Sequence, residues 1–426
     1  MLDNNNLQIK QAIWAYFLLL LFEGALRKWF LPGLATPLLI IRDPLALWIV
    51  VAAARRDLLP YNGLVVTMLI VGILGTITAV IFGHGNLFVA IYGARMLLFH
   101  FPMIYVMGSI LARTDVINIG KATVWITIPM TVLITLQFYS PQSAWVNHGI
   151  GDVEGTGFSG ALNYFRPPAT FSFNNGTTLF YSFAAPFVLY FWLAKEKFNK
   201  IILAIATGCL LLSIPLSISR GLFFQIALSV MFMVFVIIRK PEYLGKLVVA
   251  IIGICIISIP LSQTKFFQTA TGAFTNRFED ANKNEGGMEG VLMDRYLGGL
   301  VAALGQAPDS PVTGYGLGMG TNVGSMLLSG QITFLIAEGE WGRVIGELGP
   351  FMGVAVILVR IILTWQLIAA SYRKLSDGDL LPWMLLSFGL LIIAQGGWSQ
   401  PTSLGFCIMI AGLMLACLNP KAANEQ

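Results

Sequence analysis

The sequence is short of charged residues. Only 11% of its 426 residues are Asp, Glu, Lys or Arg, whereas 56% are hydrophobic and the mean hydropathy is +0.77. Soluble globular domains carry about 25% charged residues, so a soluble fold of this size would lack the charge to cover its surface. The composition excludes an ordinary soluble protein and indicates a large lipid-facing surface.

Disulfide, metal and nucleic-acid signals are also missing. The cysteines lie singly in apolar runs without metal-ligand spacing, which predicts small core or lipid-facing residues and no disulfide framework. The histidines are scattered, and the net charge of +5 is not gathered on a basic face with interleaved aromatic residues. We therefore expect no metal, no cofactor and no nucleic-acid partner. These residues are Cys209, Cys255, Cys407, Cys417, His84, His100 and His148.

Apolar stretches of about 20 residues recur along the chain, and each is long enough to cross a membrane as a helix. They predict an all-α, polytopic membrane protein with about twelve transmembrane helices. The first apolar stretch follows about ten polar residues and has no cleavage site after it, so we expect a retained helix. The predicted spans are 11–30, 37–54, 62–82, 87–112, 116–139, 171–194, 200–218, 221–238, 246–264, 342–367, 381–397 and 402–418.

Loops rich in Lys and Arg alternate along the chain with the loops on the other side of this bundle. Short loops dense in cations all fall on one side, which is the pattern of cytoplasmic loops. The alternation predicts that both termini are cytoplasmic. The cations on this side are Lys10, Arg55, Arg56, Arg113, Lys121, Lys195, Lys197, Lys200, Arg239, Lys240, Lys246, Arg373, Lys374 and Lys421.

Two long connections, at about 140–170 and 265–341, fall on the opposite side, where function is expected. Within the second, 288–304 has apolar residues at helical spacing, which predicts an amphipathic helix on the membrane surface or over a cavity. The organisation is thus a bundle over 1–264, an extracytoplasmic loop over 265–341 and C-terminal transmembrane helices over 342–426.

Two arginines lie within or beside predicted spans, where a charge is energetically unfavourable. Arg95 is about two turns inside a predicted span, so it needs an anion, a cavity or a partner; a buried ion pair and a snorkelling side chain stay open. Arg220 follows Ser219 at the break between two apolar runs. Ser219 is a candidate helix cap, and an arginine beside that helix terminus favours a phosphate. The alternative for Arg220 is an interfacial anchor.

Further ionisable residues lie in the outer connections. Their arginines suggest an anionic substrate, because the positive-inside tendency disfavours cations there. Carboxylates in EGEWGRVIGELG at 338–349 are candidates for a general base on a sugar hydroxyl, or else favour a helix N-terminus through its dipole. GYGLGMG at 314–320 lacks the Lys-Ser/Thr of a phosphate-binding loop and predicts a flexible turn. The residues in question are Arg166, Arg277, Arg295, Arg343, Glu338, Glu340 and Glu347.

Several segments resemble the O-antigen ligase and O-antigen polymerase superfamily. SISRGLFFQIAL at 217–228 resembles its Ser-Arg-Gly segment, and RPPATFSFNN at 166–175 is similar to its Arg-Pro element, with Ala169 where Gly is usual. Arg295 before TGYGLG, and EWGRVIGELGPFMG at the return to the membrane, match in order. EGALRKWFLP and the later RDP resemble a subgroup of exopolysaccharide polymerases. The His-Asn pair of the ligases is absent, since Glu338 and Gly339 stand there.

This resemblance implies a GT-C-like fold and a metal-independent glycosyltransferase in the cytoplasmic membrane of a bacterium. It implies an undecaprenyl-pyrophosphate-linked glycan as donor and another as acceptor, with membrane lipids, a chain-length regulator and a flippase as partners. Arg220 and Arg295 would hold the pyrophosphate, and Glu338 or Glu340 would orient or deprotonate the acceptor. Substrate binding would involve Arg95, Arg166, Arg277 and Arg343. A ligase is the alternative within this class, and a transporter or flippase is the alternative outside it.

Overall fold

The computed structural model describes residues 2–154, 157–194, 196–245, 262–284, 298–306 and 310–419. Ten helices in these ranges are long and apolar enough to cross a membrane, and Leu381–Gln395 is a shorter apolar helix. The chain is therefore a multi-pass membrane protein. The ten are Asn6–Phe30, Pro32–Ala54, Gly63–Ile81, Leu87–Ile110, Arg113–Tyr139, Asn174–Leu193, Lys200–Ser217, Arg220–Arg239, Glu340–Ser376 and Pro401–Leu418.

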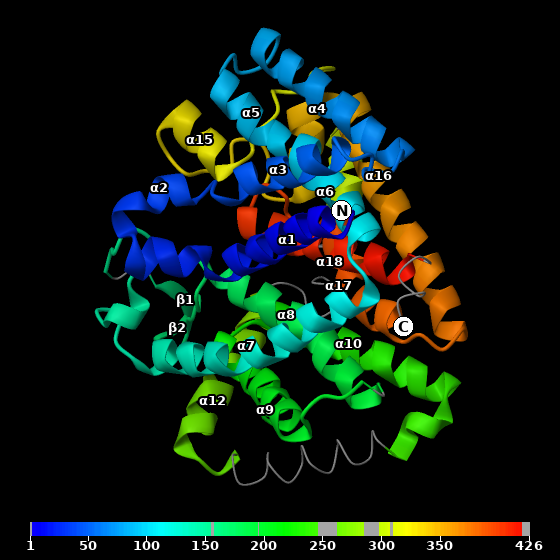
Figure 1. Cartoon of the computed structure of the whole chain (residues 1–426). Coiled ribbons are helices and arrows are strands. Elements are labelled where there is room, and N and C mark those ends of the chain that lie inside the picture. Colours follow the sequence, from blue (N-terminus) through cyan, green and yellow to red (C-terminus); the bar gives the residue numbers. More distant parts are fainter. Residues whose placement is uncertain are drawn as a thin grey trace.

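Figure 1 shows the arrangement of the elements. The N-terminal half contains α1 (Leu2–Ala25), η1 (Leu26–Phe30), η2 (Pro32–Leu34), α2 (Ala35–Leu38), α3 (Arg42–Ala54), α4 (Gly63–Ile81), α5 (Leu87–Arg95), η3 (Met96–His100), α6 (Phe101–Ile110), α7 (Arg113–Tyr139) and η4 (Trp145–Asn147). After these come β1 (Phe158–Ala161), β2 (Tyr164–Arg166), α8 (Asn174–Leu193), α9 (Lys200–Ser217), α10 (Arg220–Arg239), η5 (Pro241–Tyr243), α12 (Lys265–Asn284), α14 (Gly299–Gln306), α15 (Asn322–Ser329), α16 (Glu340–Ser376), α17 (Leu381–Gln395) and α18 (Pro401–Leu418).

The predicted helices match these elements closely. Eleven of the predicted spans coincide with a candidate span or with the shorter α17, and the remaining one, 246–264, lies almost entirely outside the described residues. The second span is broken between α2 and α3, because the chain turns over residues 39–41 and begins a new helix with Pro44 in its first turn. Of the predicted amphipathic helix, only α14 falls within the described residues, and it packs against α16.

The bundle is organised around α8 and α18. In each, 78% of the most apolar window is buried inside the protein, compared with 28% for Pro32–Ala54. The ring centroids of Phe183 of α8 and Phe406 of α18 are 5.6 Å apart, and both rings belong to the buried apolar core. Helices on the outside keep apolar residues such as Ile77 and Trp365 exposed, which fits contact with lipid.

The cation-rich loops meet on one face of the bundle. Lys10 lies 2.7 Å from Asp115, and the Arg113 guanidinium pairs with both Glu196 and Asp379. The C-terminal end of α18 joins the same face, where the Asn419 side chain donates to the Gly108 carbonyl. Loops far apart in the sequence are thus assembled on one side, as the alternation of Lys and Arg predicts.

The longer connections meet on the opposite face. The Trp29 indole donates to the Trp145 carbonyl at 3.1 Å, His84 contacts the Leu317 carbonyl at 3.1 Å, and Asn175 donates to Gln400 at 3.2 Å. In Figure 1 the β1–β2 hairpin, α2 and α15 lie on the left of the view and the start of α1 lies to the right. We call the side that contains the longer connections the loop face.

The connection at 140–170 contains a hairpin that the sequence analysis did not anticipate. β1 and β2 are antiparallel, with Phe158 opposite Arg166. The turn residues Leu162 and Asn163 both have positive φ, which is the geometry of a tight two-residue hairpin turn. Asn163 tolerates positive φ, but no glycine follows it, so the turn signal in the sequence is weak.

α16 is bent at its tenth residue, Gly349, and the glycine-rich segment 314–320 fills the bend. Gly349 has φ +76° and ψ 174°, which interrupts the helix at this point. The amides of Tyr315 and Gly316 donate to the carbonyls of Gly346 and Glu347. The segment predicted as a flexible turn is therefore hydrogen-bonded and packed between α16, α4 and α5.

Candidate functional site

Three of the predicted arginines come together on the loop face. Arg166 ends β2, Arg220 begins α10 and Arg277 lies in α12, and all three are half-buried. Burial, and then the positive charges of Arg277 and Arg220, lower the pKa of the Arg166 guanidinium. Charges from segments more than 100 residues apart are therefore near neighbours. We call Arg166, Arg220 and Arg277 the arginine cluster.

Packing of aromatic residues brings these segments together. Phe223 and Phe224 of α10 lie against Phe278 of α12, with ring centroids 6.3 and 6.0 Å away. α12 also packs against α9 and β1. The arginine in β2 is thereby held beside the arginines of two helices.

The start of α10 is built as the sequence predicts. The Ser219 hydroxyl accepts a hydrogen bond from the Leu222 amide at 3.3 Å, so Ser219 caps the helix. The preceding Ile218 has φ +49°, a strained conformation for a β-branched residue, and its side chain packs close to Gly160 of β1. This tight break orients Arg220 at the helix N-terminus, where the helix dipole favours an anion.

Arg166 has unused donor capacity. Its Nε is buried and has no hydrogen-bond partner in the described part of the chain. A buried donor without a partner costs about 1–3 kcal/mol, and an incoming anion would relieve that cost. A guanidinium presents several donors in a planar fork, which matches phosphate oxygens. This corner of the loop face can bind an anion such as a phosphate.

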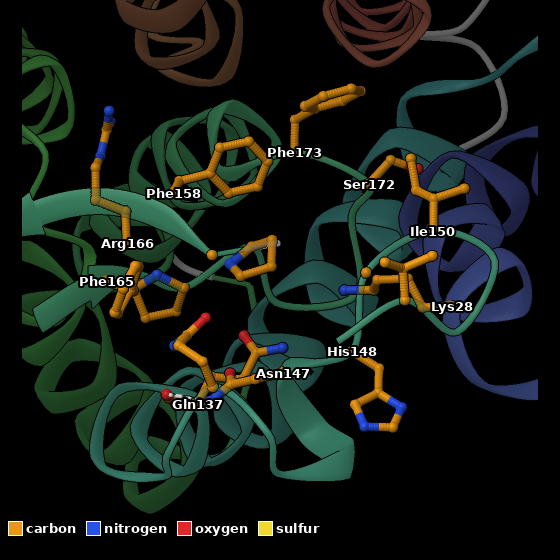
Figure 2. A pocket seen from close by; sticks show the side chains of 16 residues that line it. Lys28, Gln137, Asn147, His148, Ile150, Phe158, Phe165, Arg166, Ser172 and Phe173 are labelled. Atoms are coloured by element: carbon orange, nitrogen blue, oxygen red, sulfur yellow. Dashed lines mark hydrogen bonds between the residues drawn. The ribbon is translucent and has the colours of Figure 1, made fainter. Parts of the chain in front are cut away.

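A cavity of about 300 Å³ lies next to the cluster (Figure 2). Its walls come from the end of η1, the end of α7, the 140–173 connection and β1–β2. His148 lies at this cavity and its Nδ1 is 2.5 Å from the Asp152 carboxylate, which raises the pKa of the imidazole. The lining residues are Lys28, Gln137, Gln142, Asn147, His148, Gly149, Ile150, Val153, Gly157, Phe158, Phe165, Arg166, Pro167, Pro168, Ser172 and Phe173.

Arg95 lies apart from the cluster in a buried ion pair, one of the alternatives that the sequence left open. Its Nη1 is 2.7 Å from the Asp43 carboxylate, its Nε donates to the Tyr92 carbonyl, and its guanidinium stacks on the Tyr92 ring at 4.0 Å. The remaining Nη2 is buried without a hydrogen-bond partner among the described residues. His100 contacts the same carboxylate at 3.5 Å. The substrate role predicted for Arg95 remains a prediction.

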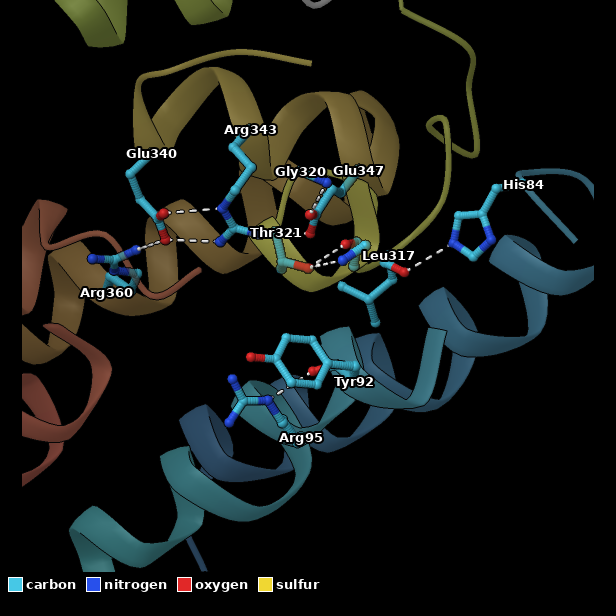
Figure 3. Close-up of polar contacts among 12 residues, drawn as sticks. His84, Tyr92, Arg95, Leu317, Gly320, Thr321, Glu340, Arg343, Glu347 and Arg360 are labelled. Atoms are coloured by element: carbon cyan, nitrogen blue, oxygen red, sulfur yellow. Dashed lines mark hydrogen bonds and ion pairs between the residues drawn. The ribbon is translucent and has the colours of Figure 1, made fainter. Parts of the chain in front are cut away.

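Arg343 and Glu340 are engaged with each other (Figure 3). Arg343 donates to both carboxylate oxygens of Glu340 and, at 2.6 Å, to Glu347. Arg360, further along α16, donates to the same Glu340 carboxylate and to the carbonyls of Ile393 and Gly396. Glu347 also accepts from the Gly320 amide. These four charged side chains tie the start of α16 to the end of α17 and to the glycine-rich segment.

The two remaining predicted residues differ in environment. Glu338 is exposed in the loop just before α16, and its carboxylate has no hydrogen bond or ion pair to the residues that the structure describes. Arg295 lies outside the described residues, so its predicted role in holding pyrophosphate stays untested.

Several buried charged residues were missed by sequence reasoning. Glu23 accepts from Arg27 and Arg42, and Lys28 is buried beside the cavity. Arg360 is fully buried in α16 and stacks over Trp398 at 4.3 Å. Each lies inside a predicted span, where a charge is costly, so the cost that singled out Arg95 applies equally to them.

Comparisons add no family to this picture. No protein-family model matches the sequence, and no curated protein is similar to it. Within the described ranges, no group of three or more His, Cys, Asp or Glu residues gathers as metal ligands. The assignment of function therefore rests on the geometry of the site and on the residues themselves.

Proposed function

We propose that this protein is a membrane glycosyltransferase that polymerises undecaprenyl-pyrophosphate-linked repeat units into an exopolysaccharide or O-antigen. The observation that carries the proposal is the convergence of Arg166, Arg220 and Arg277 on the loop face, beside a cavity and a helix N-terminus. This is a site for a multiply charged anion at the membrane surface. The resemblance to the O-antigen ligase and polymerase superfamily supplies the class of substrate.

In the proposed reaction, an acceptor sugar hydroxyl attacks the anomeric carbon of the donor glycan. The bond from that carbon to the phosphate oxygen breaks, and undecaprenyl pyrophosphate leaves with the electron pair. The arginine cluster and Arg295 stabilise the negative charge that develops on the leaving group. The proton of the acceptor passes to a base.

Glu338 is the better candidate for that base. Both carboxylate oxygens of Glu340 already accept hydrogen bonds from arginines, whereas Glu338 is exposed in the loop that enters α16. A general base must come within hydrogen-bond reach of the hydroxyl it deprotonates. Glu340 then acts as an anchor for Arg343 and Arg360.

Mass spectrometry of lipid-linked glycans in cells lacking the protein tests this proposal. We expect single lipid-linked repeat units to accumulate and polymer to disappear, with rescue by the wild-type gene and not by Arg166→Ala. Accumulation of long lipid-linked polymer would point to a ligase. Repeat units retained on the cytoplasmic leaflet would point to a flippase. Unchanged polymer would overturn all three readings.

A further inference from the structure

The cavity on the loop face contains a second cation that the proposed reaction does not use. The lining includes three aromatic rings and two prolines, and Lys28 lies on another side of the cavity from Phe158 and Phe165 (Figure 2). These lining residues are Phe158, Phe165, Phe173, Pro167 and Pro168. The Phe158 and Phe173 ring centroids are 5.7 Å apart. At about 300 Å³ the cavity is at the small end of ligand pockets, which suits one sugar ring.

The Lys28 side chain is fixed in position, but no carboxylate of the described residues pairs with it. Its side chain is 1% exposed, its Nζ donates to the Ala169 carbonyl, and it lies 4.3 Å from the centroid of the Trp29 ring. An ammonium has three donors, so two remain for a ligand. No carboxylate lies within ion-pair distance of it in the ranges that the structure covers.

The neighbouring Arg27 differs from Lys28 in its partners. Arg27 donates to the Ala35 carbonyl, to the Ser172 hydroxyl at 2.9 Å and to Glu23 at 3.5 Å, so its charge is compensated by the protein. Glu23 is shared between Arg27 and Arg42 and does not reach Lys28. An uncompensated buried ammonium is costly, and an anionic ligand reduces that cost.

The position of Ala169 reinforces this geometry. Its φ is +52°, a conformation that glycine adopts more easily, and its amide donates to the Gln137 side chain. This strained residue aims its carbonyl at the Lys28 ammonium. The Ser172 hydroxyl, which accepts from Arg27, still has its own proton to donate at the cavity wall.

We propose that this cavity binds a sugar residue bearing a carboxylate, a hexuronate, with Lys28 as its counter-ion and the Phe158–Phe173 wall against the apolar face of the ring. The inference rests on the proposed function for the source of that sugar, an acidic residue of the repeat unit. Arg166 lines the same cavity, but its guanidinium points away from Lys28 (Figure 2), so the proposed carboxylate position lies on the Lys28 side. A single point charge suits a carboxylate, whereas the arginine forks suit phosphate.

Binding of free monosaccharides to the full-length protein tests the proposal without requiring transfer. Saturation-transfer NMR is recorded with sodium glucuronate and with glucose, on protein in nanodiscs of neutral phosphatidylcholine. We expect glucuronate to bind in preference to glucose. Lys28→Met should weaken glucuronate binding by roughly 10- to 100-fold, the effect of losing a charged hydrogen bond. Lys121→Met, a lysine in α7 near the opposite face, is the matched control and should bind normally.

Equal binding of glucose and glucuronate, or normal glucuronate binding by a folded Lys28→Met, would overturn the subsite. So would displacement of glucuronate by a lower concentration of inorganic phosphate, or by phosphatidylglycerol in the nanodisc, which would assign the cavity to a phosphate group. If Lys28→Met does not fold, Phe173→Ala replaces it, since Phe173 is 46% exposed. Unchanged glucuronate binding in that variant would also overturn the proposal. The two hypotheses fail separately: unchanged polymer in cells lacking the protein, with glucuronate binding intact, overturns the proposed function alone, and lost polymer without preferential glucuronate binding overturns the subsite alone.

Discussion

The residues of the arginine cluster differ in their surroundings within the protein. Arg166 has a buried Nε without a partner among the described residues, whereas Arg220 lies at a capped helix start. In the proposed reaction they bind two neighbouring phosphates. The planar guanidinium of each arginine, and not its charge alone, determines how well it binds a phosphate.

Arg220→Lys should therefore damage transfer. Lysine keeps the charge but loses the fork that contacts two phosphate oxygens, at a cost of about 2–4 kcal/mol of barrier, by analogy with loss of an oxyanion donor. This corresponds to roughly a hundredfold or more in rate. The measurement is polymer formed from lipid-linked repeat units by purified protein. Arg239→Lys, at the other end of the same α10, is the control and should retain full activity. Near-normal polymer from Arg220→Lys would remove this residue from the site.

Arg360 is a structural residue by its contacts. It is fully buried and joins Glu340 of α16 to two carbonyls at the end of α17. Arg360→Met leaves a buried carboxylate and two carbonyls short of donors, which should destabilise the fold by about 3–5 kcal/mol. The thermal unfolding midpoint in detergent measures this. Arg373→Met, at the exposed end of α16, should leave the midpoint unchanged. Equal midpoints for the two variants would contradict the structural role.

At the scale of elements, the bend in α16 is the feature on which the loop face depends. It releases the carbonyls of Gly346 and Glu347 to the amides of Tyr315 and Gly316. The same bend brings Glu347 to the Gly320 amide. The long loop is in this way fastened back onto the membrane bundle.

Gly349→Ala should disrupt this fastening. A Cβ at position 349 would lie 2.1 Å from the Val312 carbonyl oxygen, and φ is +76°, a conformation that alanine adopts with strain. We expect a clear fall in the thermal midpoint. Gly208→Ala in α9 is the control: its Cβ would meet nothing within 4 Å, so helix propensity should leave that variant equal to or more stable than the wild type. A normal midpoint for Gly349→Ala would show that the bend tolerates a side chain.

At the scale of the whole molecule, the cation-rich face and the loop face lie at opposite ends of the bundle. From the positive-inside tendency we expect the cation-rich face to be cytoplasmic. The proposed function requires the arginine cluster to lie on the other side.

Cysteine labelling tests this orientation. In a background without the four native cysteines, single cysteines replace Asn284 on the loop side and Asn419 after α18. An impermeant thiol reagent should label position 284 and not 419 in intact spheroplasts. Labelling of 419 alone would invert the topology and place the arginine cluster in the cytoplasm.

Chelation tests the absence of metal from the proposed reaction. The arginines supply the positive charge that a metal ion would otherwise bring to the pyrophosphate. Polymer formation by the purified protein should therefore survive EDTA. Loss of activity in EDTA with rescue by magnesium or manganese would contradict this role of the arginines.

The sequence by itself indicated the membrane class and the eleven predicted spans that match described helices, because lipid demands long apolar helices. The orientation that the Lys and Arg pattern indicates remains a prediction. The sequence also located the Ser219 cap, since that signal is local. Only the tertiary structure decided which charged residues meet. Arg166, Arg220 and Arg277 converge, whereas Arg95 and Arg343 are ion-paired, and neither outcome is readable from spacing along the chain. Lys28 and Arg360 resemble any other intramembrane charge in the sequence, and their distinct partners arise from how the helices pack.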